Sequence, residues 1–131
     1  MTAALAYLDT SAYVKVPLGE PERPALLEAL QSYALVSSRL LSVEAVRACA
    51  RYGPEYAQAA DAGLGAVSLL PIDDAILSHA KTLQPAQLRT LDALHIATAL
   101  SLGPDLAVVV SYDDRLSDAA RANGLSVLTP R

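Results

Sequence analysis

Two uninterrupted apolar runs lie near the two ends of the chain, and each leads to an acidic residue. Residues 5–8 run directly into Asp9, and residues 106–110 are followed closely by Asp113. Neither run alternates apolar with polar positions, which predicts strands buried on both faces, as in a parallel sheet. Ligands of open parallel sheets bind beyond the carboxyl ends of the strands. The two acids therefore mark the edge of the predicted sheet where a ligand site is expected.

Three shorter apolar segments, at residues 34–37, 67–71 and 125–128, predict further strands. Helical segments separate the strands, and we expect them at residues 11–16, 21–30, 41–52, 56–64, 73–83, 90–101 and 113–123. This alternation predicts one α/β domain over residues 1–131, a three-layer α/β/α sandwich around a mainly parallel five-stranded sheet. A strand order of 3-2-1-4-5 would place the strands before Asp9 and Asp113 side by side.

Composition limits the classes of protein to which the chain can belong. A length of 131 residues with 53% hydrophobic content suffices for one domain with a substantial core. The single cysteine, Cys49, excludes an internal disulfide and a cysteine metal cluster. The N-terminus has no signal-peptide pattern and no apolar run is long enough to span a bilayer, so we expect a cytoplasmic protein with no membrane partner.

A net charge of −4 has the wrong sign for binding nucleic acid through overall charge. Such binding would need local basic residues or a metal ion.

Four acids are expected to meet at the carboxyl edge of the sheet. Asp9 and Asp113 follow the two central strands, and the helices expected at 41–52 and 90–101 carry Glu44 and Asp92 in their first turns. Carboxylates crowded in this way repel one another unless a cation binds between them. A ligand set made only of oxygen suits Mg²⁺ or Mn²⁺ and argues against zinc.

Each acid also has a purely structural explanation. Asp9 and Asp113 stand where a helix N-cap is expected, and Asp92 lies near the positive end of a helix. Glu44 could pair with Arg47 across one helical turn. Taken singly, the acids therefore do not distinguish a metal site from a set of helix caps.

Four motifs, taken together, resemble those of the PIN-domain ribonucleases. Residues 9–15, DTSAYVK, resemble the first motif of that family, and residues 42–47, SVEAVR, the second. Residues 91–99, LDALHIATA, resemble the third and residues 111–116, SYDDRL, the fourth. The motifs follow in the family's order and spacing over nearly the whole chain. In size the chain is most similar to the VapC toxins of bacterial toxin–antitoxin pairs.

The resemblance implies a metal-dependent endoribonuclease whose acidic site consists of Asp9, Glu44, Asp92 and Asp113. It implies Mg²⁺ or Mn²⁺ as cofactor, RNA as substrate, products with a 5′-phosphate, a small antitoxin partner and a homodimer. The three aspartates are the expected metal ligands, and Glu44 is expected at the edge of the site, where it binds the metal through a water molecule or helps to deprotonate the attacking water. The neighbouring Asp114 makes the fourth position ambiguous, and we favour Asp113.

Several other residues near this edge have two explanations each. Ser11 and Ser111 occupy positions where the family keeps a hydroxyl that orients the acids, although a turn hydrogen bond is an alternative. His95 lies one turn after Asp92, where we expect a packed, hydrogen-bonded side chain rather than a metal ligand. Basic residues such as Arg89 and Arg115 could contact phosphates or could be ordinary solvated charges.

Three further function classes fit parts of the pattern. A haloacid-dehalogenase-like phosphatase also has an aspartate after its first strand, but it needs a second aspartate at the position of Ser11. A phosphoacceptor receiver domain needs a lysine at the end of its last strand, which this chain lacks. A non-catalytic PIN-like binding module is a third alternative, against which the intact set of four acids counts.

Overall fold

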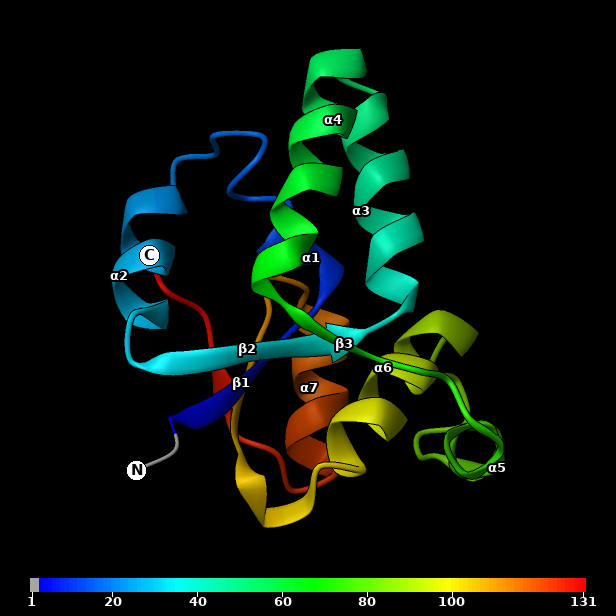
Figure 1. Ribbon diagram of the computed structural model, residues 1–131. Helices are drawn as coiled ribbons and strands as arrows, with labels where there is room; N and C mark the ends of the chain where they lie inside the picture. Colours follow the sequence, from blue (N-terminus) through cyan, green and yellow to red (C-terminus); the bar gives the residue numbers. More distant parts are fainter. Residues whose placement is uncertain (1–2) are drawn as a thin grey trace.

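A single parallel sheet forms the centre of the protein. The computed structural model describes residues 3–131, and within that range it contains five strands in the order β3-β2-β1-β4-β5 (Figure 1). The strands are β1 Ala4–Leu8, β2 Tyr33–Ser38, β3 Ser68–Leu70, β4 Leu106–Val110 and β5 Val127–Leu128. All neighbouring pairs are parallel. The predicted sheet and its strand order are confirmed.

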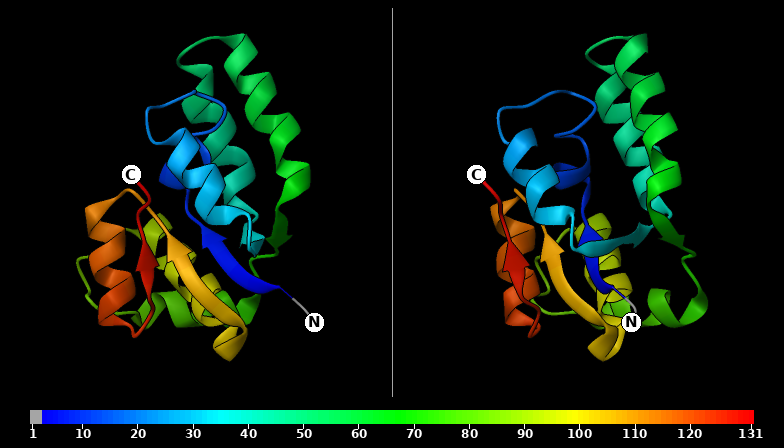
Figure 2. Two further views of the ribbon diagram at one scale, coloured as in Figure 1. Left: turned by 90° about the vertical axis from the view of Figure 1, so that its left-hand side faces the viewer. Right: turned by 60° about the vertical axis from the view of Figure 1, so that its left-hand side comes forward.

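Helices cover both faces of this sheet, as the predicted sandwich requires. One face carries α1 to α4 and the other carries α5 to α7 (Figure 2). The α-helices are α1 Thr10–Tyr13, α2 Arg23–Leu30, α3 Leu40–Ala50, α4 Pro54–Gly63, α5 Asp74–Thr82, α6 Thr90–Leu100 and α7 Asp114–Ala122. Short 3₁₀ turns at Leu64–Ala66 and Gly103–Asp105 precede β3 and β4.

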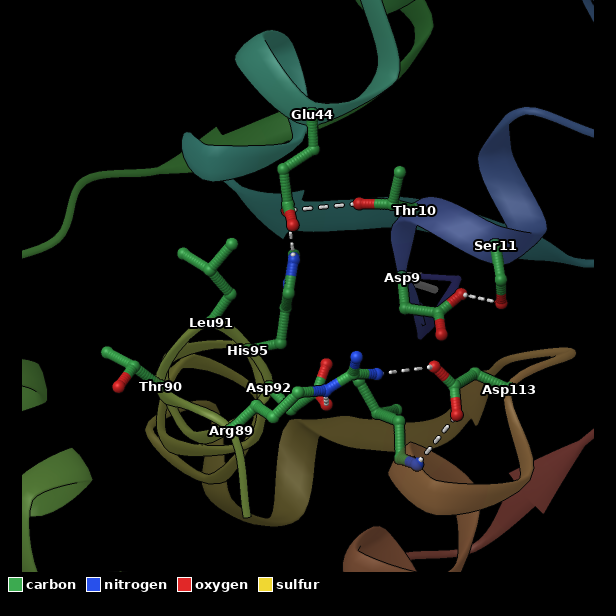
Figure 3. A pocket seen from close by; sticks show the side chains of 11 residues that line it. Asp9, Thr10, Ser11, Glu44, Arg89, Thr90, Leu91, Asp92, His95 and Asp113 are labelled. Atoms are coloured by element: carbon green, nitrogen blue, oxygen red, sulfur yellow. Dashed lines mark hydrogen bonds and ion pairs between the residues drawn. The ribbon is translucent and has the colours of Figure 1, made fainter. Parts of the chain in front are cut away.

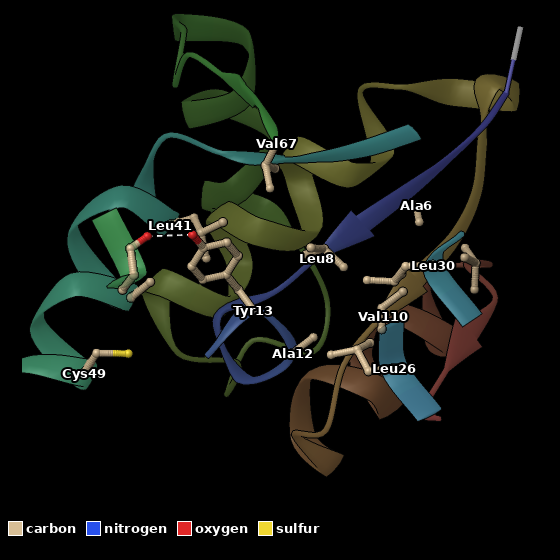
Figure 4. Packing of buried hydrophobic residues seen from close by; sticks show 13 residues of the cluster. Ala6, Leu8, Ala12, Tyr13, Leu26, Leu30, Leu41, Cys49, Val67 and Val110 are labelled. Carbon is tan, nitrogen blue, oxygen red and sulfur yellow. Dashed lines mark hydrogen bonds between the residues drawn. The ribbon is translucent and has the colours of Figure 1, made fainter. Parts of the chain in front are cut away.

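Two hydrophobic clusters fill the space between the layers. Because successive strand residues point to opposite faces, Ala6 and Leu8 of β1 join one cluster and Tyr7 joins the other. The first cluster includes Leu41 from α3, and Figure 4 shows Leu41 and Leu8 among its side chains. The second includes Ile96 from α6. The apolar strands are therefore buried on both faces, as their sequence predicted.

The carboxyl ends of β1 and β4 lie side by side. Leu8 is aligned with Val110, and the Asp9 amide donates to the Val110 carbonyl over 3.2 Å. The blue β1 and the orange β4 point in the same direction in Figure 2. Asp9 and Asp113 follow these two strands and are the N-caps of α1 and α7, so both acids lie at the same edge of the sheet.

Several predicted elements are shorter than expected, among them the first helix and the last strand. The helix expected at residues 11–16 ends as an α-helix at Tyr13, and the chain continues in turns to Gly19, which has a φ of 63°. Pro17 cannot donate a backbone hydrogen bond, which helps to prevent a longer helix there. The last strand is limited to Val127–Leu128. No helix within residues 3–131 is long and apolar enough to cross a membrane.

Candidate active site

The four predicted acids line one cavity at the carboxyl ends of the central strands. Asp9, Glu44, Asp92 and Asp113 all border a space of about 380 Å³, together with Arg89, His95, Thr10 and Ser11 (Figure 3). Each acid comes from a different part of the fold: the β1–α1 turn, α3, α6 and the β4–α7 turn. The structure therefore brings together residues that are up to about a hundred positions apart in the chain.

Asp9 is buried and held by three hydrogen-bond donors. Its side chain caps α1 by accepting from the Ala12 amide over 2.9 Å. The Ser11 hydroxyl donates to Oδ1 over 2.7 Å, and the Ser111 hydroxyl donates to Oδ2 over 2.5 Å. Burial raises the pKa of the Asp9 carboxyl, and these donors only partly offset that effect. Asp9 is thus a helix cap that also presents a carboxylate to the cavity.

Asp92 has a buried oxygen without a hydrogen-bond donor. It lies in the first turn of α6, and its Oδ2 has no hydrogen-bond partner among the described residues. The Arg89 Nε lies 3.4 Å from that oxygen, an ion pair whose geometry falls short of a hydrogen bond. Burial raises the pKa of the Asp92 carboxyl, and the negative charge of Asp113 raises it further. The position therefore favours the approach of a cation.

Asp113 belongs to the cavity and Asp114 does not. The Asp113 Oδ1 caps α7 by accepting from the amides of Arg115 and Leu116 over 2.9 and 3.2 Å. Its Oδ2 lies 3.9 Å from Nη2 of Arg89 and is the oxygen available to a ligand. Asp114 is exposed in the first turn of α7 and is not among the residues that line the cavity.

Glu44 is held by partners on two other helices. The Thr10 hydroxyl contacts its Oε1 over 3.0 Å, and Nε2 of His95 lies 2.6 Å from the same oxygen. The other ring nitrogen of His95, Nδ1, lies 2.7 Å from the Tyr7 hydroxyl. The alternative in which Glu44 pairs with Arg47 is wrong, because the basic side chain that contacts the Glu44 carboxylate, among residues 3–131, is that of His95.

Comparison with known proteins assigns the chain to a family. Residues 6–122 match the PIN domain, which is most of the chain. The chain belongs to the PIN domain family.

Relatives of this PIN domain include named ribonucleases and toxins. Ribonuclease VapC46 of Mycobacterium tuberculosis is 43% identical over 97% of this chain and 98% of the relative. The crystal structure of M. tuberculosis VapC20, described as a Sarcin-Ricin loop cleaving toxin, superimposes with a TM-score of 0.75 at 18% identity and covers 95% of this chain and 99% of VapC20. A toxin–antitoxin complex from Klebsiella pneumoniae contains a chain with a TM-score of 0.73 and 20% identity, covering 96% and 98% of the two chains. The two solved structures support the fold, and the resemblance seen in the sequence is confirmed.

The donor set of this PIN domain fits a hard divalent cation. Carboxylate oxygens are the ligands that Mg²⁺ and Mn²⁺ prefer, and Oδ2 of Asp92, which accepts no hydrogen bond from residues 3–131, is a buried acceptor that such an ion would satisfy. In their present orientations, however, no three His, Cys, Asp or Glu side chains within residues 3–131 surround one point closely enough to hold a metal ion. Arg89 lies between Asp92 and Asp113 and supplies the positive charge there. A metal ion would need Arg89 to move aside, which its exposed side chain can do.

Two residues of the site, Tyr7 and Arg89, were not predicted to have these roles. Tyr7 lies in the apolar run of the first strand, and nothing in the sequence indicates that its hydroxyl reaches His95. Arg89 was one of several basic residues expected near the site, and the structure shows that it contacts Asp92 and Asp113. The spacing of His95 one turn after Asp92 placed it near the site, and its buried, hydrogen-bonded state agrees with the packing that we expected.

Proposed function

We propose that this PIN domain is an endoribonuclease toxin that hydrolyses RNA phosphodiester bonds with Mg²⁺ or Mn²⁺ in the acidic cavity. The observation that carries the proposal is the meeting of four carboxylates from four parts of the fold, one with a buried oxygen that accepts no hydrogen bond from residues 3–131. Repulsion between clustered carboxylates lowers the stability of the folded protein unless a cation binds. Clustered acids with perturbed pKa values are typical of functional sites. The 43% identity to a protein named as a ribonuclease supports RNA as the substrate.

Asp9, Asp92 and Asp113 would hold the metal ion. The bound ion would supply Lewis-acid chemistry, by contacting a phosphodiester oxygen and favouring ionisation of the attacking water. Ser11 and Ser111 fix the Asp9 carboxylate, so its lone pairs keep a defined direction. Asp113 is fixed through the backbone amides at the start of α7, which leaves Oδ2 free for a ligand.

Glu44 would take a proton from the attacking water. Both of its hydrogen-bond partners use Oε1, so Oε2 is the oxygen left for this step. A positioned carboxylate of this kind contributes about 10²- to 10⁴-fold in rate as a general base. The mechanism needs no catalytic histidine, which agrees with the buried position of His95.

Arg89 supplies positive charge that the chain as a whole lacks. Its guanidinium pairs with Asp92 and Asp113, and 64% of its side chain is exposed. When a metal ion neutralises the two acids, the released guanidinium would be free to contact an RNA phosphate at the cavity mouth. The net charge of −4 is thereby compensated locally, where the substrate binds.

A small antitoxin is the proposed protein partner. A structural neighbour of this chain was solved as a toxin–antitoxin complex, and the acidic cavity is complementary to a basic side chain. An antitoxin arginine or lysine entering the cavity would take the place of the metal's charge. Replacing that basic residue by alanine should weaken inhibition, and full inhibition by the alanine variant would show that the partner acts elsewhere. The homodimer stays a prediction that light scattering on the purified protein can measure.

Cleavage of an RNA panel tests the proposed function. Wild type should cut RNA with Mg²⁺ or Mn²⁺, stop in EDTA and leave 5′-phosphate ends. Asp9→Asn should abolish cutting, although asparagine can still accept the Ala12 amide and cap α1. Asp105→Asn is the control, because Asp105 is exposed at the opposite end of β4. Unchanged cleavage by Asp9→Asn would overturn the proposal, and a protein that binds RNA without cutting it would be a binding module.

A phosphatase is not favoured by the structure. At the position where that chemistry needs a second acid, the Ser11 hydroxyl donates a hydrogen bond to Asp9. A serine at this place supports the first carboxylate and offers no proton-transfer group of its own.

A further inference from the structure

A buried chain of hydrogen bonds leads from the sheet to Glu44. The Tyr7 hydroxyl lies 2.7 Å from Nδ1 of His95, and Nε2 of His95 lies 2.6 Å from Oε1 of Glu44. Tyr7 and His95 are only 1% and 2% exposed. Their rings pack edge to face at a centroid distance of 5.9 Å, which restricts rotation of the imidazole. Three elements, β1, α6 and α3, are thus linked through side chains alone (Figure 3 shows the contact between His95 and Glu44).

The chemistry of the three groups sets the direction of the hydrogen bonds. An ionised Glu44 can only accept, so Nε2 must carry the proton in this contact. A neutral imidazole then has a lone pair on Nδ1, which needs a donor. The Tyr7 phenol is that donor, because its hydroxyl carries a proton and lies 2.7 Å from Nδ1. Tyr7 therefore selects the tautomer in which His95 donates to Glu44.

Glu44 needs such an anchor because of its neighbours. It shares the cavity with Asp9, Asp92 and Asp113, whose negative charges would drive a flexible glutamate toward solvent. The donor from His95 and the hydroxyl of Thr10 both act on Oε1 and fix the carboxylate without adding a competing metal ligand. A group that orients a functional carboxylate in this way usually contributes about 10- to 100-fold to activity.

We propose that Tyr7 and His95 are positioning residues that hold Glu44 toward the cavity in the orientation needed to accept a proton. The effect on RNA cleavage rests on the proposed function, whereas the hydrogen-bond direction does not. His95 acts through Glu44 and does not contact the substrate. Tyr7 acts one step further away, through the tautomer of His95.

Two substitutions of His95 separate positioning from packing. The amide nitrogen of glutamine reaches roughly the place of Nε2, whereas the amide of asparagine reaches only that of Nδ1. His95→Gln should therefore still donate to Glu44, while His95→Asn should not, although both variants lose the ring. We expect His95→Asn to lower kcat by about 10- to 100-fold with KM nearly unchanged. His95→Gln should restore most of that loss.

Imidazole ¹⁵N NMR measures the proposed tautomer without any RNA. In the wild type the His95 proton should reside on Nε2, whereas exposed His79 provides an internal reference that averages over both tautomers. Tyr7→Phe removes only the hydroxyl and keeps the aromatic packing. This variant should shift His95 toward a mixture of tautomers and lower kcat in the same direction as His95→Asn.

The outcomes are distinguishable from those of the proposed function. A wild type that cuts RNA, with equal kcat for His95→Asn and His95→Gln, would overturn the positioning role and leave the nuclease intact. A His95 proton found on Nδ1 would overturn it whatever the activity. A protein that cuts no RNA, but whose His95 proton resides on Nε2 and responds to Tyr7→Phe, would contradict the proposed function and support the hydrogen-bond chain.

Discussion

The Ser111 hydroxyl donates to Oδ2 of Asp9 over 2.5 Å, although the two residues are 102 positions apart in the chain. The contact exists because β1 and β4 are parallel neighbours whose last residues, Leu8 and Val110, are aligned. Ser111 also receives a hydrogen bond from the Asp113 amide over 3.0 Å. One hydroxyl therefore connects the acids that follow both central strands, and it does so without exposure to solvent.

Removing the Ser111 hydroxyl should destabilise the protein, although the group is a single polar atom. Ser111→Ala leaves a buried carboxylate oxygen without its donor, which costs about 1–3 kcal/mol of unfolding free energy. Urea denaturation at neutral pH measures the loss. Ser126→Ala is the matched control because Ser126 is exposed, and it should change the unfolding free energy by less than about 0.5 kcal/mol. Equal effects of the two substitutions would contradict the role of Ser111.

Neutralising Asp92 should stabilise the metal-free protein, in a manner that depends on pH. Burial and the charge of Asp113 raise the folded-state pKa of Asp92, so folding favours its protonated form. Ionisation of Asp92 therefore lowers the free energy of unfolding. This loss is absent below the ordinary aspartate pKa of about 3.9, and it develops as the pH rises from there through the folded-state pKa.

Unfolding of wild type and Asp92→Asn in EDTA measures this effect. The two proteins should have similar unfolding free energies near pH 4, and Asp92→Asn should be the more stable one at pH 7. A constant difference across this range would mean that Asp92 experiences no net penalty for its charge. The comparison is made between wild type and Asp92→Asn because acids remote from Asp92 contribute equally to both curves.

A divalent metal ion should reverse this order of stability. Mn²⁺ binding to the folded wild type adds RT ln(1 + [L]/Kd) to its unfolding free energy, and Asp92→Asn lacks one ligand and gains less. Wild type should therefore have the lower Tm in EDTA and the higher Tm in Mn²⁺. If Mn²⁺ shifted neither Tm and Asp92→Asn melted below wild type in EDTA, the acids would be helix caps rather than one metal site.

The arrangement of the strands could be predicted because the apolar runs carry a clear signal. Residues 5–8 and 106–110 contain no polar interruption, and in the structure their ends are buried from both sides. The four acids could be placed at one edge because parallel strands end there. Asp9 and Asp113 each cap a helix and also line the cavity. The helix-cap explanation and the shared-site explanation are therefore compatible.

Side-chain contacts between distant elements could not be read from the sequence. The sequence offered Arg47, on the same helix, as a possible partner of Glu44, but the basic side chain that contacts its carboxylate is that of His95 on α6. Helical periodicity reports which residues share a face of one helix and contains no information about the facing helix. The structure distinguishes the two adjacent acids by position, because Asp113 caps α7 and lines the cavity whereas Asp114 is exposed in the first turn of α7.

The most direct test of the proposed metal-dependent nuclease site compares RNA cleavage by Asp113→Asn and Asp114→Asn. The two substitutions remove the same charge from adjacent residues, and asparagine at position 113 can still cap α7. With saturating RNA and Mn²⁺, Asp113→Asn should lose more than about 100-fold in kcat, beyond the usual effect of a residue that only supports a ligand. Asp114→Asn should cut at close to the wild-type rate. Equal rates for the two variants, or a greater loss for Asp114→Asn, would contradict the account.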